Sequence, residues 1–210
     1  MTILAERPAV ALVPKRGEIR IRTIPARRIL KIDGEGRPDG PAFRAAVEAL
    51  YPVAYGVHFA LGRRGIDAPV GTLEGLWSFD PTAAPPAPTE PFIPPDADTW
   101  RWTLFLELPE TATDAEVLAA VEGAQRRRPA PELAELRDVW FEEGLVVEAL
   151  HVGPYATEPE TIARMATAAA EAGLERCGPH HEIYLGDPRR SAPERLRTLL
   201  RQPVAPRREA

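Results

Sequence analysis

Cysteine is almost absent from this chain of 210 residues, and long apolar runs are missing. The one cysteine, Cys177, cannot form an internal disulfide, which agrees with a reducing compartment. Nowhere do about 18 apolar residues follow one another, as a membrane-spanning helix requires. Residues 1–17 also lack an apolar core behind a basic start, so they do not have the pattern of a signal peptide. These absences predict a cytoplasmic protein with no membrane partner.

An excess of positive charge is missing as well. The chain has 26 Lys and Arg residues against 31 Asp and Glu residues, which gives a net charge of -5. Such a balance provides no overall attraction to nucleic acid or to an anionic membrane. No helix-turn-helix segment is evident ahead of the main body of the chain. We therefore expect no direct nucleic-acid partner, and a complete one-component transcription regulator is disfavoured.

The usual signatures of metal and cofactor sites are also lacking. The run His180-His181-Glu182 suggests a metal cluster, but neighbouring residues of a strand face opposite sides and cannot easily close on one ion. No second cluster of His or Cys supplies further ligands. The Gly34-Glu35-Gly36 spacing matches no nucleotide-binding fingerprint, so loop geometry explains these glycines better. We expect no metal and no cofactor, and Cys177, without an assignable base, is expected to be a passive thiol.

The residues that are present are those of an ordinary globular protein. Hydrophobic residues make up 44% of the chain and charged residues 27%. A chain of this length can bury a good core as one large domain or as two small modules. Disorder throughout is excluded.

The stretch 180–196 predicts a strand, a turn and a capped helix. Successive side chains of a strand face opposite sides, so Glu182 and Tyr184 share one face, while Ile183 and Leu185 share the other and are expected to be core. Glycine and proline at 186–188 predict the turn. The capping box at 191–194 and the helical spacing of three leucines predict a helix over 192–200. The leucines are Leu196, Leu199 and Leu200.

Two series of elements in similar order are expected along the rest of the chain. The first half gives a short strand at 19–21, a strand at 26–33, a long helix at 41–61 bent at Pro52 or divided there, strands at 72–79 and 100–108, and a capped helix from Thr113. The second half gives a hairpin of strands 137–142 and 145–152 turned at Glu143-Gly144, a capped helix at 157–173, a strand at 181–185 and the helix already described. The proline-rich segment 80–98 is expected to be an extended excursion between paired strands.

The similar order of elements predicts an α+β fold of two pseudo-symmetric modules whose sheets form a central concave surface. Aligning the last strand-helix pairs places 100–104 over 180–184. Trp102 then takes the position that Glu182 has in the other half. This alignment predicts aromatic walls from one module and a carboxylate from the other.

Four stretches together resemble a known family. They are 180–196, Leu150-His151-Val152-Gly153-Pro154-Tyr155, Leu73-Glu74-Gly75-Leu76-Trp77 and Trp100-Arg101-Trp102-Thr103. From about Ile29 to Val204 the chain resembles the stand-alone GyrI-like small-molecule-binding proteins. The resemblance implies two tandem strand-helix-strand-strand modules around a ligand cleft. It implies a domain at 26–204, with modules at 26–128 and 132–204, between tails at 1–25 and 205–210.

The resemblance leaves two classes of function open. Some members are implied to hydrolyse cyclopropane-bearing, DNA-alkylating toxins, which would make this protein a detoxifying hydrolase that adds water to a planar hydrophobic compound. Others only bind drugs or form the effector domains of transcription regulators, which would make it a multidrug-binding or sensing protein for planar cationic drugs. The expected partner is a planar hydrophobic or cationic small molecule in either case.

The candidate site combines carboxylate and aromatic residues. Flat aromatic side chains can sandwich a planar molecule, and a partly buried carboxylate can attract a cation or accept a proton. The catalytic candidates are Glu182, Tyr184 and Tyr155, and the ligand-binding candidates are Trp77, Trp102, Tyr55, His58 and Trp140. Core packing is the competing interpretation for the tryptophans, a surface or salt-bridged position for Glu182, and packing or solvent exposure for Tyr55 and His58.

Overall fold

The computed structural model describes residues 3–4, 13–38, 40–78 and 100–207. The strands are β1 (Ile3–Leu4), β2 (Ile19–Ile24), β3 (Arg27–Glu35), β4 (Ile66–Asp67), β5 (Glu74–Ser78), β6 (Arg101–Glu107), β7 (Arg137–Phe141), β8 (Gly144–Val152), β9 (Leu174–Arg176), β10 (His180–Tyr184) and β11 (Arg197–Pro206). The helices are α1 (Pro41–Arg63), α2 (Asp114–Arg127), α3 (Glu132–Glu135) and α4 (Glu158–Glu171), with 3-10 turns η3 (Tyr155–Thr157) and η4 (Pro193–Arg195). The proline-rich segment 80–98 lies outside the described residues.

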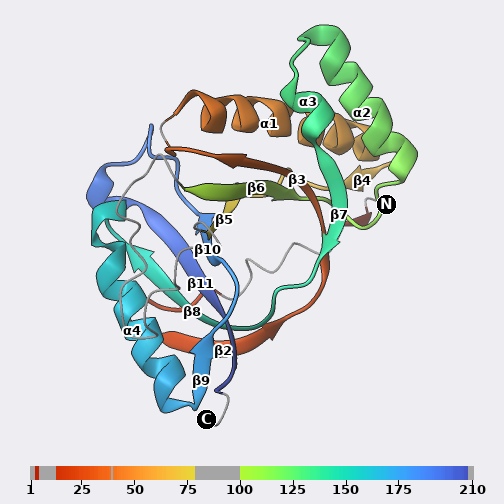
Figure 1. Ribbon diagram of the computed structural model, residues 1–210. Coiled ribbons are helices and arrows are strands. Elements are labelled where there is room, and N and C mark those ends of the chain that lie inside the picture. Colours follow the sequence, from red (N-terminus) through yellow and green to blue (C-terminus); the bar gives the residue numbers. More distant parts are fainter. Residues whose placement is uncertain (1–2, 5–12, 39, 79–99, 208–210) are drawn as a thin grey trace.

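The predicted α+β fold of two modules is confirmed. In the first module, β3, α1, β5 and β6 follow one another, and in the second β8, α4, β10 and β11 do so (Figure 1). The main sheet has the order β2-β8-β11-β10-β5-β6-β3-β7, with β9 paired to β11. The modules join in the middle of this sheet, where β5 and β10 pair antiparallel. The candidate site therefore lies where the two modules meet.

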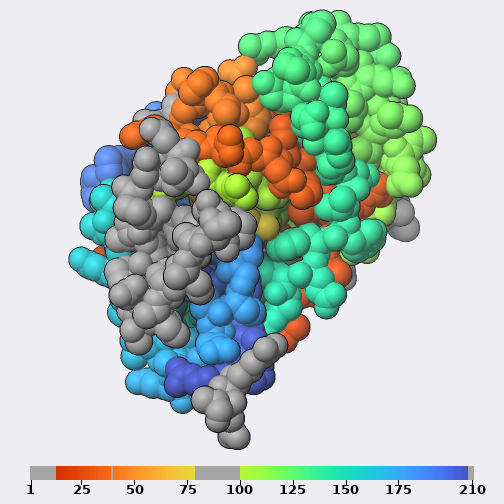
Figure 2. Space-filling view, viewed as in Figure 1, coloured from red at the N-terminus to blue at the C-terminus, as the bar shows by residue number. Residues whose placement is uncertain are grey.

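The sheet is strongly curled, because two of its strand pairs continue around a corner. β2 ends at Ile24 and β3 begins at Arg27, yet β2 pairs with β8 and β3 pairs with β7. The partner chain bends at the same place, since β7 ends at Phe141 and β8 begins at Gly144. The antiparallel pairs Arg27–Phe141 and Ile24–Gly144 flank the bend. The result is a half-barrel, and Figure 2 shows both halves of the chain meeting in one continuous surface.

Helix α1 covers the first module and begins after Gly40 with Pro41 in its first turn, a position where the missing amide proton costs no hydrogen bond. It runs through Pro52 as one continuous helix, so the predicted division into two helices is not found. Its apolar stripe, Leu50, Val53, Val57 and Leu61, is fully buried against the sheet and the helices α2 and α3. Helix α2 has the predicted capping box, in which Thr113 and Glu116 bond reciprocally.

The predicted helix over 192–200 is wrong. The capping-box segment forms only the 3-10 turn η4, and the chain then enters the long strand β11. β11 pairs with β10 on one side and with β8 on the other. A helix here would leave the backbone groups along both neighbouring strands without partners in the interior, and the sheet therefore overrides the local signal.

Two further predictions about pairing are also wrong. β7 and β8 do not form a hairpin, because the chain turns a corner at Glu142-Glu143 and each strand pairs elsewhere. The alignment of Trp102 with Glu182 also fails. In the order of the modules β6 corresponds to β11, and β5 corresponds to β10. Both errors have the same cause: strand partners are set by long-range packing, which local patterns do not specify.

Candidate functional site

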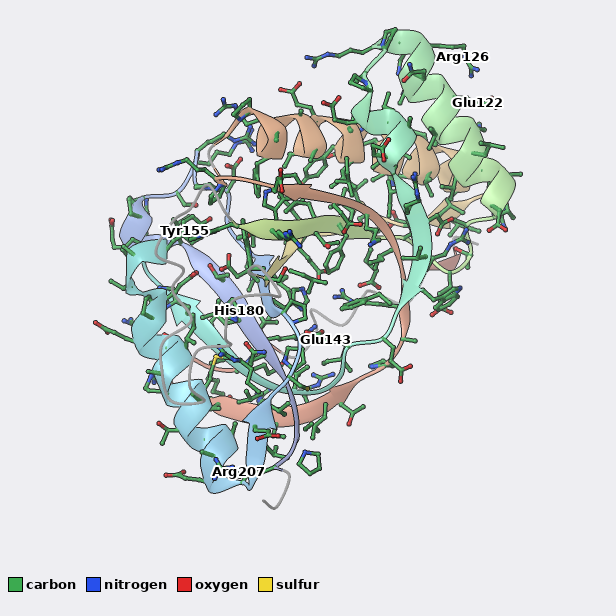
Figure 3. The ribbon with its side chains drawn as sticks, in the orientation of Figure 1. Glu122, Arg126, Glu143, Tyr155, His180 and Arg207 are labelled. Atoms are coloured by element: carbon green, nitrogen blue, oxygen red, sulfur yellow. The ribbon has the colours of Figure 1, made fainter. Side chains whose placement is uncertain are left out.

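A cavity of about 890 Å³ lies between α1, the segment η3–α4 and the middle of the sheet. Strands β5 and β10 form its floor, and the turn after β10 closes one end. Figure 3 labels Tyr155 beside α4 and His180 toward the middle of the curled sheet, both of which line the cavity. The cavity thus takes its walls from both modules, as a cleft at a module joint should.

Strand alternation decides which side chains form the floor. His180, Glu182 and Tyr184 of β10 all line the cavity. In the antiparallel register, Trp77 of β5 lies opposite His180, and Gly75 lies opposite Glu182. The missing side chain at Gly75 leaves room beside the carboxylate, since a Cβ there would lie 3.1 Å from Trp77 Nε1 and 3.2 Å from the Tyr184 hydroxyl.

The aromatic walls are fixed by contacts with one another. Trp77 Nε1 donates a hydrogen bond of 3.1 Å to the Tyr184 hydroxyl, and Phe43 of α1 stacks on Trp77 with ring centroids 6.0 Å apart. Tyr155 meets Tyr184 edge to face, with centroids 6.2 Å apart. Trp100 packs edge-on against Trp77 at 5.4 Å. These rings give the cavity rigid, flat, apolar surfaces suited to a planar ligand.

Two carboxyl groups line the cavity, of which that of Glu158 is buried and that of Glu182 is partly buried. Glu182 on the floor has a side chain that is 16% exposed, and burial raises its pKa to about 7, although Tyr184, His181 and Trp77 act in the opposite direction. Glu158, in the first turn of α4, is 5% exposed. Burial, reinforced by the Glu182 carboxylate, raises the pKa of Glu158 to about 9, against the effect of Thr198. At neutral pH Glu158 therefore keeps its proton, and Glu182 is about half protonated.

The remaining titratable groups of the floor are neutral near neutral pH. Burial lowers the pKa of His180 to about 3, so its ring carries no charge. Burial raises the pKa of Tyr155 to about 12 and that of Tyr184 well above its ordinary value. Both tyrosines therefore retain their protons and can donate hydrogen bonds to a ligand.

Comparison with known proteins identifies the family. The family model for the GyrI-like small molecule binding domain matches residues 105–205. An uncharacterized conserved protein from Listeria innocua is 33% identical, with 90% of this chain and 93% of that chain covered and a TM-score of 0.81. The chain belongs to the GyrI-like family of small-molecule-binding proteins. A hydrolase from Listeria innocua is 32% identical, with the same 90% and 93% covered and a TM-score of 0.76.

More distant relatives share the fold only. The C-terminal domain of EcmrR is 10% identical, with 90% of this chain and 98% of that domain covered and a TM-score of 0.55. No curated protein matches the chain. In this chain, the cavity between the two modules offers aromatic surface and the carboxyl groups of Glu158 and Glu182 to a small molecule.

The structure brings four of the predicted site residues together. Glu182, Tyr184, Tyr155 and Trp77 all line the GyrI-like cavity. Trp102 instead lies in the core under α1, 4% exposed, where its Nε1 donates to the Gly36 carbonyl at 3.2 Å. It meets the cavity residue Phe43 edge-on, at 5.6 Å between ring centroids.

The other three predicted residues lie away from this cavity. Tyr55 is 48% exposed and lines a separate groove between α1 and α2. His58 Nδ1 is 2.7 Å from the carbonyl oxygen of Ala68. Trp140 on the edge strand β7 is 61% exposed. None of the three lines the cavity that holds Glu182.

Glu158 was missed because its sequence context indicated only a helix start. The segment Thr157-Glu158-Pro159-Glu160 has the composition of a cap, although Thr157 makes no side-chain capping bond here. A usable signal was nevertheless present: Glu158 precedes Ile162 by four and Met165 by seven residues, so it belongs to the inward face of α4. An acidic residue on an apolar face next to Tyr155 indicates a carboxyl directed into the cleft.

The opposite face of the same strands carries a buried network of ion pairs. His181 Nδ1 is 2.7 Å from Glu143 and its Nε2 is 3.0 Å from Glu74, so both ring nitrogens face carboxylates. Both must donate, which makes the ring an imidazolium and agrees with its raised pKa, in which Glu143 and Glu74 outweigh burial. Arg27 binds Glu74 through two hydrogen bonds of 2.7 and 2.6 Å.

The network continues on the second module. Arg201 of β11 reaches Glu143 at 3.3 Å and Glu148 at 3.0 Å. Figure 3 labels Glu143 near the middle of the curled sheet. Every buried carboxylate of this network thus has a cationic partner, whereas the two carboxyls of the cavity have no Lys or Arg partner in the part of the chain that the structure describes.

Within the described ranges, no group of three or more His, Cys, Asp or Glu side chains has the arrangement of a metal site. Over the same residues, no helix is both long enough and apolar enough to cross a membrane. Cys177 is exposed near the start of β10. Partial desolvation of its thiol, together with the negative charge of Glu175, raises the pKa of that thiol. A raised pKa leaves less thiolate at neutral pH, which does not favour a nucleophile.

Proposed function

We infer that this GyrI-like protein binds planar hydrophobic compounds in the cavity and hydrolyses those that carry an electrophilic, strained ring such as a cyclopropane. The observation that carries this proposal is the placement of the Glu182 carboxyl, with its pKa raised to about 7 by burial, on a floor made of Trp77 and Tyr184. A base with a pKa near the working pH is well suited to proton transfer. The 32% identity to a hydrolase from Listeria innocua supports the same class of reaction.

The proposed step adds one water molecule across the ring. The Glu182 carboxylate takes a proton from water as the water oxygen bonds to the ring methylene carbon. The ring carbon–carbon bond breaks, and its electron pair passes through the conjugated system to a carbonyl oxygen. Tyr184 or Tyr155 donates a hydrogen bond to that oxygen as negative charge develops there. The proton held by Glu182 finally returns to the product, which leaves a hydroxymethyl group and a phenol.

The experiment uses the purified protein and a cyclopropane-bearing alkylator. Mass spectrometry should find a product heavier by one water molecule. Glu182→Gln keeps the shape and removes the base, so turnover should fall by about a hundredfold or more while binding of the planar ligand is largely kept. Glu48→Gln is the matched control, because Glu48 lines the same cavity but is 57% exposed and paired with Arg128. Full turnover by Glu182→Gln would show that Glu182 is not the base.

A second function, sequestration or sensing of planar cationic drugs, is favoured by the carboxyl pair. Two acids that have no Lys or Arg partner among the described residues can attract a ligand cation, and the surrounding rings add cation–π attraction. If neither the parent nor Glu182→Gln adds water to any such substrate while both bind dyes, the protein is a binding protein.

A further inference from the structure

The carboxyl groups on the two faces of the sheet have different surroundings. On the network face, Glu74, Glu143 and Glu148 each lie within ion-pairing distance of Arg27 or Arg201. On the cavity face, no Lys or Arg of the described segments lies within 4.0 Å of Glu158 or Glu182. The difference is not a matter of burial, since Glu158 is only 5% exposed.

The geometry of Glu158 indicates that a partner enters from the cavity. Its Oε1 is buried and has no hydrogen-bond partner among the described residues. A buried carboxylate oxygen in that state costs free energy unless it is protonated or meets a cation. Glu182 lines the same cavity, and its negative charge opposes ionisation of Glu158, so the two carboxyls do not ionise together easily.

We propose that Glu158 and Glu182 form a proton-exchange site for a planar organic monocation: the cation enters the aromatic cavity and the proton that the two carboxyls share leaves. The cation replaces the proton one for one, so the charge inside the cavity stays the same before and after binding. The aromatic surfaces of Trp77 and Tyr155 receive the flat body of the ligand. The inference rests on the binding part of the proposed function, not on turnover.

The titration behaviour of the cavity is consistent with this exchange. Between about pH 7 and about pH 9 the pair carries about one proton, since burial raises the two pKa values to about 7 and about 9. His180, Tyr155 and Tyr184, which surround the pair, are neutral over this range, and Asp187 has a lowered pKa through its hydrogen bond from Arg189. The Arg44 guanidinium and Glu48, which is ion-paired with Arg128, line the same cavity.

The test is calorimetric titration with N-methylacridinium and with a neutral carbocyclic analogue of the same shape. Each titration is repeated in buffers that differ in ionisation enthalpy, which gives the number of protons released. The cation should release about one proton, and its affinity should rise by up to about tenfold per pH unit between about pH 7 and about pH 9. The neutral analogue should release none, and its affinity should not increase with pH.

Variants separate the pair from other sources of protons. In Glu158→Gln, the carboxyl with the higher pKa is gone and the remaining Glu182, with a pKa of about 7, is mostly ionised at about pH 8, so proton release there should fall well below one. The double variant should lose about a hundredfold or more in affinity for the cation and keep its affinity for the neutral analogue. Glu160→Gln on the exposed side of α4 is the matched control and should behave like the parent.

The outcomes distinguish this inference from the proposed function. If the neutral analogue binds but the cation releases no proton, or releases the same number in all variants, the exchange site is wrong and planar-ligand binding stands. If the double variant binds the cation as well as the parent does, the carboxyl pair is likewise not the site. If neither probe binds, both the exchange site and planar-ligand binding fail.

Discussion

Trp102 lies directly opposite Gly34 in the pairing of β6 with β3, with its indole ring over the glycine. A Cβ at Gly34 would lie 2.2 Å from the ring carbon Cη2 and 2.5 Å from Cζ2. The Nε1 of the same ring donates to the Gly36 carbonyl two residues further along. The missing side chain at Gly34 thus leaves the space that the Trp102 ring fills, and Trp102 is a structural residue of the first module.

Gly34→Ala should therefore destabilise the fold by at least about 2 kcal/mol, because an aromatic ring packed on all sides cannot move aside cheaply. Trp102→Ala should cost about 3–5 kcal/mol, as expected for a large buried aromatic residue. Urea unfolding followed by circular dichroism measures both. Gly62→Ala in α1 is the control, since a Cβ there meets nothing within 4 Å and the change should be neutral or slightly stabilising. A Gly34→Ala variant as stable as the parent would contradict this packing.

The sequence predicts well those elements whose secondary structure depends on the pattern of their own residues. The apolar stripe of α1 gives its helical period, and the alternation around Glu182 places it with Tyr184 on one face. The segment 192–200, which includes the start of β11, is predicted as a helix because Ser191–Glu194 carries a strong local capping signal. The pairing of β11 with β8 and β10 instead depends on residues 14 to 57 positions away. Local signals cannot report such pairing.

The same contrast between local pattern and long-range packing applies to the residues of the candidate site. Trp77, Tyr155, Glu182 and Tyr184 were found because aromatic and acidic residues stand out in short motifs. Trp102 stands in a similar aromatic motif, but its side chain has a different neighbour. Only the register of β3 against β6 places it over Gly34 rather than in the cavity. Glu158 was available from the helical period of α4, but its place beside Glu182 depends on how α4 crosses the sheet.

Trp77 should report ligand binding by its fluorescence, because it lines the cavity and donates to Tyr184. A planar dye stacked on it should quench its emission. Trp77→Ala should weaken dye affinity by about 1–3 kcal/mol, the usual loss for an aromatic anchor. Trp140→Phe is the control: Trp140 is exposed on β7, so the substitution should leave affinity unchanged. Equal affinities for Trp77→Ala and the parent, measured by titration, would rule out Trp77 as a wall.

The stability of the protein should be greatest on the acidic side of neutrality. The Arg27 partner lowers the pKa of Glu74 to about 2 despite burial, so its contribution is present above its ordinary pKa and is lost as the pH falls. Glu158 and Glu182 have raised pKa values, so the folded state binds more protons than the unfolded state and loses stability as the pH rises toward about 7 and about 9. We expect a maximum between about pH 4.5 and about pH 6.

Glu158→Gln tests the alkaline side of this profile. It removes a carboxyl that the folded state keeps protonated well above its ordinary pKa, so at about pH 8 it should stabilise the fold by on the order of 2 kcal/mol. The gain should disappear near pH 4.5, where the carboxyl is protonated in the folded state at little cost. Thermal unfolding across this pH range measures the difference in stability between Glu158→Gln and the parent. Glu160→Gln, at an exposed position of the same helix turn, is the control. The same gain at both pH values would mean that the effect is not ionisation.

His181 should be the opposite case, a buried charge whose removal destabilises the fold. Its imidazolium bridges Glu74 of the first module and Glu143 at the corner before β8. His181→Gln can donate to only one of them and leaves a buried carboxylate with one partner fewer, which should cost about 3–5 kcal/mol. His58→Gln, which affects one contact to the Ala68 carbonyl, should cost much less.

The pH dependence distinguishes this ionic role from simple loss of packing. Because its carboxylate partners raise the pKa of His181 in the folded state, its stabilisation is fully present below its ordinary pKa and is lost as the pH rises through the folded value. The stability difference between the parent and His181→Gln should therefore be larger at about pH 6 than at about pH 9. Chemical unfolding at both pH values measures it. An equal stability difference at the two pH values would mean that His181 stabilises the fold by packing and not by its charge.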